Sequence, residues 1–281
     1  MKYKHFILTR FNLKISGFRT SAGFGSALPK EWLKNRFDLF EKYCFPSLQN
    51  QTCQNFTWLV FFDCDTPEVY RLRIESLQKQ MGNFVPVFLS SGEQPQFSAD
   101  LNETIVPFLN EEEQYVITTR IDNDDAFHCD MVQEIQRNFL ESEDCFLSFV
   151  NGLQYDVNRK FLITFRYPDN HFISRIEKRS PMHPLRLVMG ADHTKIRSIA
   201  PVRYINNPPL KKPMWIEFVH GANVANCTNL GLPLSAVLRY ESLFSIALPL
   251  SQGATLRYVF AEVPRMFLTK SIALLKRKMG K

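Results

Sequence analysis

The segment YVITTRIDNDDAFH, residues 115–128, decides the fold because it joins a predicted strand to a cluster of carboxylates. Residues 115–121 are rich in β-branched and aromatic side chains, which favours a buried strand. The strand pattern stops at Asp122, and Asp124 and Asp125 follow in the loop. Carboxylates in such a loop suit Mg²⁺ or Mn²⁺, which bind few carboxylates and keep other positions for water and phosphate. We therefore expect a Mg²⁺ or Mn²⁺ site on Asp122 and Asp124.

Two other structures would also account for an acidic loop. An EF-hand calcium loop is excluded, because Phe127 occupies the position where that loop requires glycine. A solvated acidic turn remains an alternative, since aspartate commonly forms turns. The position of the carboxylates directly after a strong strand pattern favours the metal site.

The chain before residue 115 repeats this pattern of apolar runs and amphipathic segments. Thr66 is the predicted N-cap of one helix, and Pro86 places one strand at a sheet edge. Strands separated by helices form right-handed βαβ units, so the predicted fold is α/β with a mostly parallel, Rossmann-like sheet. Strands are predicted at 5–11, 58–62 and 84–89, and helices at about 29–48, 66–81 and 101–109.

Polar residues follow three of the predicted strands, and we expect them to converge on one rim, because ligands of parallel sheets bind at the carboxyl ends of the strands. The forked donors of Arg120 suit phosphate oxygens, and Arg19, in the loop after the first strand, is a second candidate of this kind. The polar groups are Arg10 and Asn12, then Asp63 and Asp65, then the segment from Arg120 to Asp125.

The second half of the chain has a less regular pattern. Residues 145–156 and 160–167 are predicted as two strands that are joined at Asn158 and Arg159 and continue the sheet in an antiparallel sense. Residues 167–215 are rich in proline and are predicted as a loop-rich acceptor region. From residue 234 onward the pattern is helical and ends in a basic stretch.

Composition excludes several classes of protein. With 281 residues, 45% of them apolar, the chain can bury a sizeable core and is not disordered. The net charge of +6 comes from dispersed basic residues, so a nucleic-acid partner is not expected. The six cysteines follow no metal-binding or disulfide pattern. No signal peptide or membrane-spanning segment is evident, so a cytoplasmic protein is expected.

Three segments resemble family 2 glycosyltransferases of the GT-A fold. They are SLQNQTCQNFTWLVFFDCDTPE (47–68), RIDNDDAF (120–127) and MWIEFVHGANVAN (214–226). Together with the first strand and the helix around Trp32, they make the chain most similar to the bacterial rhamnosyltransferase family up to about residue 230. The resemblance implies a GT-A-like domain at 1–233, with a nucleotide-sugar half (1–125) and an acceptor half (126–233), followed by a helical, basic extension at 234–281.

The resemblance also implies roles for the polar residues of the rim. Asp63 matches the acidic residue that contacts the pyrimidine base, although the interrupted pair Asp63-Cys64-Asp65 leaves Asp65 as an alternative. Arg10 and Asn12 are implied beside the base and the ribose. The metal end of the site is implied by three further matches: Asp122 at the ribose or the metal, Asp124 as the main metal ligand, and His220 at the metal or the diphosphate.

Sugar transfer with inversion needs a carboxylate or histidine that removes the proton of the acceptor hydroxyl. The resemblance points to Asp192 in GADHTKIRSI, where Ala191 replaces the glutamate of the family's acidic pair. A helix N-cap is the alternative role of Asp192. Asp156 is the second candidate for the base, and Glu217 and Glu241 are weaker ones.

These observations together predict a metal-dependent, inverting glycosyltransferase that uses dTDP-rhamnose and a glycan or lipid-linked saccharide acceptor. A UDP-hexose donor is the alternative within this class. A nucleotide- or carbohydrate-binding protein without turnover is the alternative outside it. The basic helix predicted at 263–281 is compatible with peripheral contact with the inner face of the cell membrane.

Overall fold

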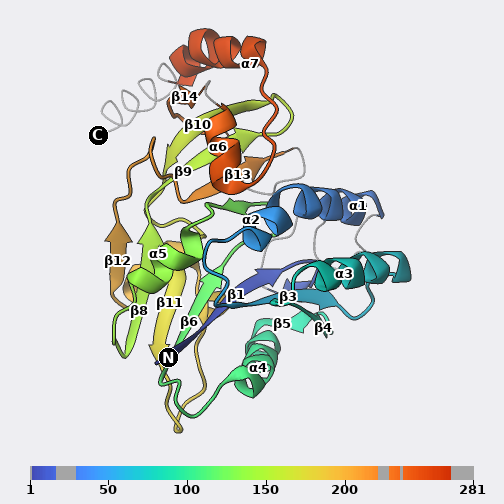
Figure 1. Ribbon diagram of the computed structural model, residues 1–281, viewed down its shortest axis with the longest axis vertical. Helices are drawn as coiled ribbons and strands as arrows, with labels where there is room; N and C mark the ends of the chain where they lie inside the picture. The colour runs from blue at the N-terminus through green and yellow to red at the C-terminus, as the bar shows by residue number, and fades with distance from the viewer. Residues whose placement is uncertain (1, 17–29, 221–227, 235–236, 267–281) are drawn as a thin grey trace, which may run out of the picture.

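The computed structural model describes residues 2–16, 30–220, 228–234 and 237–266. Its strands form a seven-stranded sheet, a five-stranded sheet and a two-stranded pair. Figure 1 shows the larger sheet in the lower half of the molecule, the smaller one above it and the last helices at the top. The acidic loop at 121–125 carries the chain from the larger sheet into the smaller one.

The seven-stranded sheet is mostly parallel. β1 is parallel to β3 and β6, β4 to β3, and β12 to β8, whereas β11 is antiparallel to both of its neighbours. This arrangement confirms the predicted α/β fold, and β4 lies at the edge, as Pro86 predicts. In spatial order the strands are β12 (Val202–Ile205), β8 (Asp144–Phe149), β11 (Ser174–Lys178), β6 (Tyr115–Arg120), β1 (Tyr3–Arg10), β3 (Thr57–Asp63) and β4 (Phe84–Leu89).

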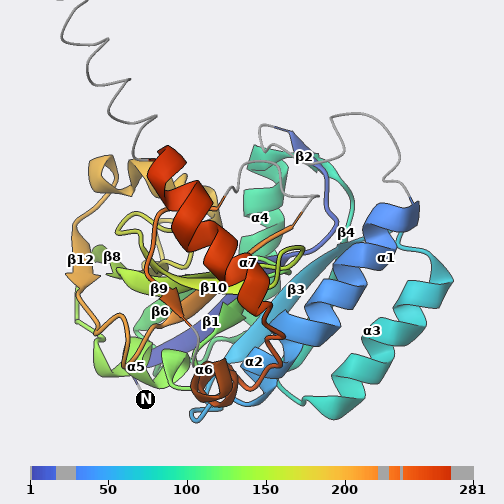
Figure 2. The ribbon, with the colours of Figure 1, turned by 90° about the horizontal axis from the view of Figure 1, so that it is seen from above.

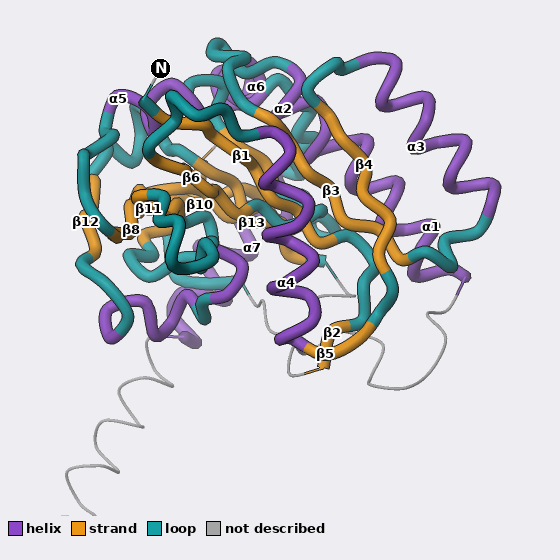
Figure 3. The backbone as a smooth tube through the Cα atoms, turned by 90° about the horizontal axis from the view of Figure 1, so that it is seen from below, coloured by secondary structure: helices purple, strands orange, loops and turns teal. Residues whose placement is uncertain are grey.

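Helices cover both faces of this sheet. Figure 2 shows α1 and α3 side by side on one face, and Figure 3 shows α4 crossing the other face below β1 and β3. On the first face lie α1 (Lys30–Leu39), a π-helical turn (Phe40–Cys44), α2 (Phe45–Gln49), α3 (Glu68–Gln80) and α5 (Met131–Arg137). On the second face lie α4 (Gln94–Ile105) and 3₁₀ turns at Val188–Gly190 and His193–Ser198, and the two-stranded pair, β2 (Ile15–Ser16) with β5 (Gly92–Glu93), adjoins α4.

The central strands alternate their side chains between these two layers, because successive residues of a strand point to opposite faces. On β1, Ile7 packs into the layer of α1 and α3, whereas Phe6 and Leu8 pack into the layer of α4. On β3, Trp58 faces the first layer and Phe61 the second. Each of these side chains is fully buried, so the sheet is the middle of a three-layer core.

The five-stranded sheet carries the C-terminal helices. α6 (Val237–Phe244) packs on it through Tyr240 and Phe244, and α7 (Gln252–Arg257), with a π-helical turn at Tyr258–Glu262, lies over β10. None of the described helices combines the length and apolar character needed to span a bilayer. The spatial order of the strands is β14 (Pro233–Leu234), β10 (Phe161–Arg166), β9 (Asn151–Asp156), β13 (Trp215–Val219) and β7 (Ala126–Phe127).

The prediction of a single strand at 145–156 is wrong. The segment forms β8 and β9, which are separated at Val150 and belong to different sheets. The hairpin around Asn158 and Arg159 is confirmed, but it builds the second sheet and does not continue the first. Both strands are buried along nearly their whole length, so the burial pattern of the sequence does not mark the break.

The region predicted as loop, 167–215, contains β11 and β12. β11 lacks an apolar pattern because Arg175 and Glu177 are buried with polar partners. Arg175 binds the Asp144 carboxylate at 2.7 Å, and Glu177 accepts the backbone N–H of Leu187 at 2.7 Å. A strand whose buried positions are charged cannot be recognised from hydrophobic periodicity.

Two helix starts also differ from the predictions. α4 begins at Gln94 instead of Leu101. Thr66 does not cap α3, whose N-cap is Pro67. The Thr66 hydroxyl donates instead to the carbonyl of Asp63 at 2.6 Å, because the chain makes a tight turn between β3 and the helix.

Gly152 of β9 is expected to tolerate no side chain, because a Cβ there would lie 2.2 Å from the indole of Trp215. That indole is fully buried, and its Nε1 donates to the carbonyl of Phe149 at 2.8 Å, which restrains it from moving. Gly152→Ala should lower the free energy of unfolding by about 2–3 kcal/mol, measured by urea denaturation. Gly82→Ala is the control, since no atom lies within 4 Å of a Cβ at Gly82. Equal midpoints for the two variants would contradict the prediction.

Candidate functional site

The candidate site lies at the carboxyl ends of β1, β3 and β6, where the chain leaves the larger sheet. The backbone N–H of Ile121 donates to Leu8 on β1 at 3.2 Å, and that of Asp125 donates to the carbonyl of Asp122 at 3.3 Å. These hydrogen bonds fix a short turn. The turn gathers the carboxylates of Asp122, Asp124 and Asp125 into one cluster.

Asp122 is paired with Arg120, the last residue of β6. The guanidinium donates to the two carboxylate oxygens through Nε and Nη2, each at 3.1 Å. Burial favours the neutral carboxyl, but the charge and hydrogen bonds of Arg120 outweigh it and hold the pKa of Asp122 well below its usual range. Asp122 is therefore ionised at neutral pH.

Asp124 lies between Arg36 of α1 and His220, which follows β13. Its Oδ2 forms an ion pair with Nη1 of Arg36 and lies 2.8 Å from Nε2 of His220. Burial opposes ionisation, yet the charge of Arg36 and the hydrogen bond of His220 lower the pKa of Asp124. The structure thus brings together Asp124 and His220, which were predicted for one site, and adds a cation that was not predicted.

Asp125 is held by groups from the second half of the chain. Its Oδ2 lies 2.8 Å from Nε2 of His171, and its Oδ1 accepts the backbone N–H of Phe218 on β13 at 2.9 Å. Burial and the neighbouring charges of Asp124 and Asp122 raise the pKa of Asp125 well above its usual range. The three adjacent carboxylates therefore do not ionise equally.

The donor atoms of Asp122, Asp125 and His171 lie within 4.8 Å of one another. Carboxylate oxygens with one imidazole nitrogen are a donor set that suits Mn²⁺ or Mg²⁺. The residues at this edge therefore fit a divalent ion. There are two candidate sites for the ion: one is formed by Asp122, Asp125 and His171, and the other by Asp124 and His220.

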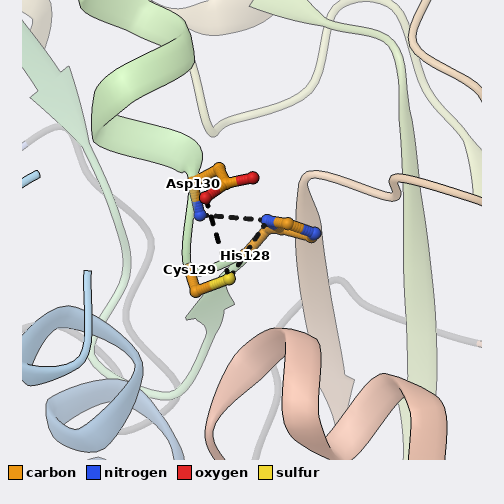
Figure 4. A group of neighbouring side chains, drawn as sticks. All are labelled: His128, Cys129 and Asp130. Carbon is orange, nitrogen blue, oxygen red and sulfur yellow. Dashed lines mark hydrogen bonds between the residues drawn. The ribbon is translucent and has the colours of Figure 1, made fainter. Parts of the chain in front are cut away.

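A second cluster of side chains that can bind metals, His128, Cys129 and Asp130, precedes α5 (Figure 4). Two of its donor groups already have partners, although Nε2 of His128 has none among the described residues. Nδ1 of His128 accepts the backbone N–H of Asp130 at 3.0 Å, and the Asp130 carboxylate forms an ion pair with Lys212 at 3.0 Å. An ion at this cluster would have to displace Lys212 from Asp130.

The groups predicted to contact a nucleobase meet at the ends of β1 and β3. Buried Asn12 accepts the backbone N–H of Asp63 at 2.9 Å and donates to Thr66 at 3.0 Å, so it holds the two strand ends together. The Asp63 carboxylate accepts the hydroxyl of Ser91, and it accepts the backbone N–H of Asp65 at 2.7 Å. The side chain of Asp65 is exposed.

A groove of about 700 Å³ opens beside Ser91, between the end of β4 and the start of α4. Its walls carry hydroxyl, amide and carboxylate groups next to the ring of Phe88. A groove of this volume is large enough for a nucleoside. Its lining residues are Phe88, Leu89, Ser90, Ser91, Gly92, Glu93, Pro95, Gln96 and Asp100.

Arg10 and Arg120 face the same small pocket, together with Phe97, Asp122 and Met189. Burial lowers the pKa of Arg10 to about 10, and the like charge of Arg120 contributes. Arg10 therefore stays charged at neutral pH. Two guanidiniums against one carboxylate leave the pocket with an excess of positive charge that suits a phosphate oxygen, and its volume of about 10 Å³ has room for one such group.

Asp192, the first candidate for the base, lies within electrostatic range of Arg120 at the rim of the site. It caps the 3₁₀ turn that follows it, because its Oδ1 accepts the hydroxyl of Thr194 at 2.7 Å and the backbone N–H of Thr194 at 3.0 Å. These hydrogen bonds lower the pKa of Asp192. The N-cap role is thus confirmed, and the other oxygen, Oδ2, lies 3.9 Å from Lys195.

Asp156, the second candidate, sits at the end of β9 beside the end of β13, with Val219 as its partner in the register. Its carboxylate accepts the backbone N–H of Arg159 at 2.8 Å and the hydroxyl of Thr228 at 3.1 Å. Oδ1 therefore stabilises the hairpin turn between β9 and β10, and Oδ2 binds the segment before β14. Glu241 likewise has a local role, since it accepts the backbone N–H of Leu248 at 2.6 Å.

Two residues of the site were missed by the sequence analysis. Arg36 follows Trp32 by four positions on α1, and its Cζ lies 5.3 Å from the centre of that ring. The aromatic residues of α1 indicate which face of the helix is buried. A charged residue on that face, such as Arg36, is a sequence signal for a buried polar site. His171 lies in the proline-rich region and has no sequence signal. Arg19 lies outside the described residues.

Glu217 of β13 is buried and accepts a hydrogen bond from Gln154 at 2.7 Å. Burial raises the pKa of Glu217 from about 4.5 to about 7. Because the unfolded chain releases this proton at lower pH than the folded one, the free energy of unfolding should fall as pH rises through this window. Glu217→Gln removes this fall in the free energy of unfolding, because glutamine does not titrate. The stability of the variant relative to wild type should therefore rise by about 2–3 kcal/mol between pH 5 and pH 8, measured by urea unfolding. A difference that is constant across this range would refute the assignment.

The model of a protein family described as "Putative rhamnosyl transferase" matches residues 4–231 of the chain. No curated protein matches the chain. Among solved structures, S. aureus TarS 1–349 in complex with UDP-GlcNAc is 12% identical with a TM-score of 0.44, covering 80% of this chain and 62% of that one. The complex of TarS 1–349 with UDP is 12% identical with a TM-score of 0.41, covering 77% and 60%.

A further structure of S. aureus TarS is 14% identical with a TM-score of 0.30, covering 56% of this chain and 22% of that one. This chain therefore spans less than two thirds of the solved chains that it matches. The family match, in contrast, runs from β1 to the segment before β14 and includes every predicted site residue except Glu241. On this match the chain belongs to the rhamnosyl transferase family.

Proposed function

We propose that this chain is a metal-dependent, inverting glycosyltransferase of the GT-A type, which transfers L-rhamnose from dTDP-rhamnose to a glycan or lipid-linked saccharide. One observation carries the proposal. Arg10, Arg120 and Asp122 share a pocket at the carboxyl edge of a parallel sheet, in a chain of the rhamnosyl transferase family. Two guanidiniums suit a diphosphate, and parallel sheets of this kind bind nucleotides at that edge.

The nucleoside would lie in the groove beside Ser91. The Asp63 carboxylate, which Ser91 and the backbone of Asp65 orient, can accept the N3–H of a pyrimidine. Thymine and uracil share this N–H, so the groove serves dTDP- and UDP-sugars alike. A UDP-hexose donor therefore remains the alternative within this proposal.

The diphosphate would lie against Arg10 and Arg120. Asp122 with Asp125 and His171, or Asp124 with His220, would hold Mg²⁺ or Mn²⁺. A divalent ion there supplies positive charge that stabilises the leaving diphosphate. Arg120 also has a second role, because its two hydrogen bonds to Asp122 fix the orientation of that carboxylate.

Asp192 is the proposed base. Thr194 donates twice to Oδ1 and leaves Oδ2 to accept the proton of the acceptor hydroxyl as its oxygen attacks the sugar. Because those hydrogen bonds lower the pKa of Asp192, the carboxylate is ionised and ready to accept a proton at neutral pH. Glu217 has the higher pKa of about 7, but it is buried against Gln154, away from solvent.

Peripheral contact with the inner face of the cell membrane is part of this proposal. Leu256 and Phe260, on the last described helical segment, are 57% and 76% exposed. Apolar side chains on a helix that leads into a basic stretch suit the surface of an anionic bilayer. The basic stretch itself, at 270–281, lies outside the described residues.

The donor site is tested by thermal shift with dTDP, UDP, GDP and CDP, each with and without Mn²⁺. We expect selective, metal-enhanced stabilisation by dTDP or UDP, and a ligand at 100-fold over its Kd adds about 2.7 kcal/mol. The double variant Asp122→Asn with Asp124→Asn should abolish the metal enhancement, because it removes a carboxylate from each of the two candidate metal sites. Asp38→Asn is the matched control, since Asp38 pairs with Lys34 and Arg73 on the surface of the helical layer. If no nucleotide stabilises the wild-type protein, the donor site does not exist.

The base is tested by the rate of sugar transfer. Asp192→Asn should lower kcat by about 10²- to 10⁴-fold and leave the Kd for the nucleotide unchanged, because the side chain acts on the acceptor hydroxyl. Glu217→Gln is the comparison variant and should retain kcat within a few-fold. A wild-type protein that binds dTDP or UDP without any turnover would favour the non-catalytic alternative.

A further inference from the structure

Arg36 occupies an unusual place for a helix residue, because it points from the last turn of α1 into the acidic loop. Its Nη1 forms an ion pair with Oδ2 of Asp124 and donates to Oδ1 of Asn123 at 3.2 Å. The Arg36 and Asp124 side chains are only 11% and 7% exposed. The pair is therefore a buried ion pair and not a surface contact.

The same carboxylate oxygen also contacts His220. Oδ2 of Asp124 lies 2.8 Å from Nε2 of His220, so two groups from distant elements converge on one atom. The carboxylate that the sequence assigns as the main metal ligand is thus already engaged by a cation of the chain itself. Asp122 is also paired with a cation, Arg120, but its donor atoms lie within 4.8 Å of those of Asp125 and His171.

The helix holds Arg36 firmly in this position. The neighbouring Phe37 is fully buried and stacks on Tyr70 of α3, with ring centres 4.7 Å apart. The Nε of Arg36 is buried and has no hydrogen-bond partner among the described residues. The guanidinium is therefore placed by its charge interaction with Asp124 and not by a fully satisfied hydrogen-bond network.

We propose that Arg36 is an internal competitor of the divalent ion: its guanidinium neutralises Asp124 when no ion is bound there, and an ion that takes Asp124 as a ligand has to displace it. The inference rests on the metal part of the proposed function. It implies that the protein alone binds Mn²⁺ weakly at Asp124. Tight binding then requires additional ligands, such as the oxygens of a bound diphosphate.

The test is the affinity of the full chain for Mn²⁺ without nucleotide, measured from the electron paramagnetic resonance signal of free Mn²⁺. Arg36→Gln should bind Mn²⁺ about 10- to 100-fold more tightly than wild type, because a competing charge-assisted hydrogen bond is lost. Arg73→Gln is the matched control, since Arg73 pairs with Asp38 and Glu41 at 3.1 and 2.8 Å away from the acidic loop. An unchanged or weakened affinity in Arg36→Gln would overturn the inference.

A second variant separates competition for Asp124 from general charge repulsion. In an Asp124→Asn background the gain from Arg36→Gln should vanish, because the contested carboxylate is absent. A gain of the same size in that background would overturn the inference. The readout is metal affinity and not transfer, so the inference and the proposed transferase activity fail independently.

If Arg36→Gln does not fold, the wild-type protein supplies the test. The side-chain N–H resonance of Arg36, assigned by its absence in Arg36→Lys, should shift on titration with Mg²⁺, while that of Arg73 should not. A resonance of Arg36 that stays unchanged at saturating Mg²⁺ would show that the ion does not displace it, and the inference would be wrong.

Discussion

The constraint on which this structure depends is the burial of the Asp124 and Asp125 carboxylates next to the half-buried carboxylate of Asp122. Buried charges are costly unless each is paired and hydrogen-bonded. Here Asp122 pairs with Arg120 and Asp124 with Arg36, and Asp125, whose pKa is raised, is hydrogen-bonded to His171. Arg120 is local to the loop, but Arg36 comes from α1 and His171 from the segment before β11, so this short loop fixes the positions of two distant parts of the chain.

The same loop joins the two sheets. Asp125 accepts the backbone N–H of Phe218 on β13, and directly after the loop Ala126 of β7 pairs with Ile216 of the same strand. His220 follows β13 and reaches back to Asp124. The second sheet is therefore anchored to the carboxyl edge of the first at the place where the donor atoms gather. A site at this junction draws residues from both sheets, which neither sheet could supply alone.

Whether the sequence could predict an element depends on the interaction that holds the element in place. The strands at β1, β3, β4 and β6 follow from hydrophobic periodicity, and the acidic ends of β3 and β6 follow from the order of residues. β11 could not be recognised, because its buried Arg175 and Glu177 look like surface residues until Asp144 and a backbone turn are found beside them. The break at Val150 was equally hidden, since both strands it separates are buried. Hydrophobic patterns report burial, and they do not report which sheet a buried strand joins.

The candidate site shows the same division between local and long-range information. Asp122 and Asp124 are visible as a motif, but the chemistry of each depends on a partner that the motif does not contain. The guanidinium of Arg120 donates two hydrogen bonds to Asp122, whose carboxylate is therefore strongly ionised. The interactions of Asp125 offset the cost of its burial less well, so Asp125 favours the neutral form. Two aspartates of one short loop thus have opposite tendencies to ionise, because Arg120 is local to the loop and the partners of Asp125 come from more than forty residues away. A motif therefore identifies where charge gathers, and only the fold decides which of its carboxylates carries that charge.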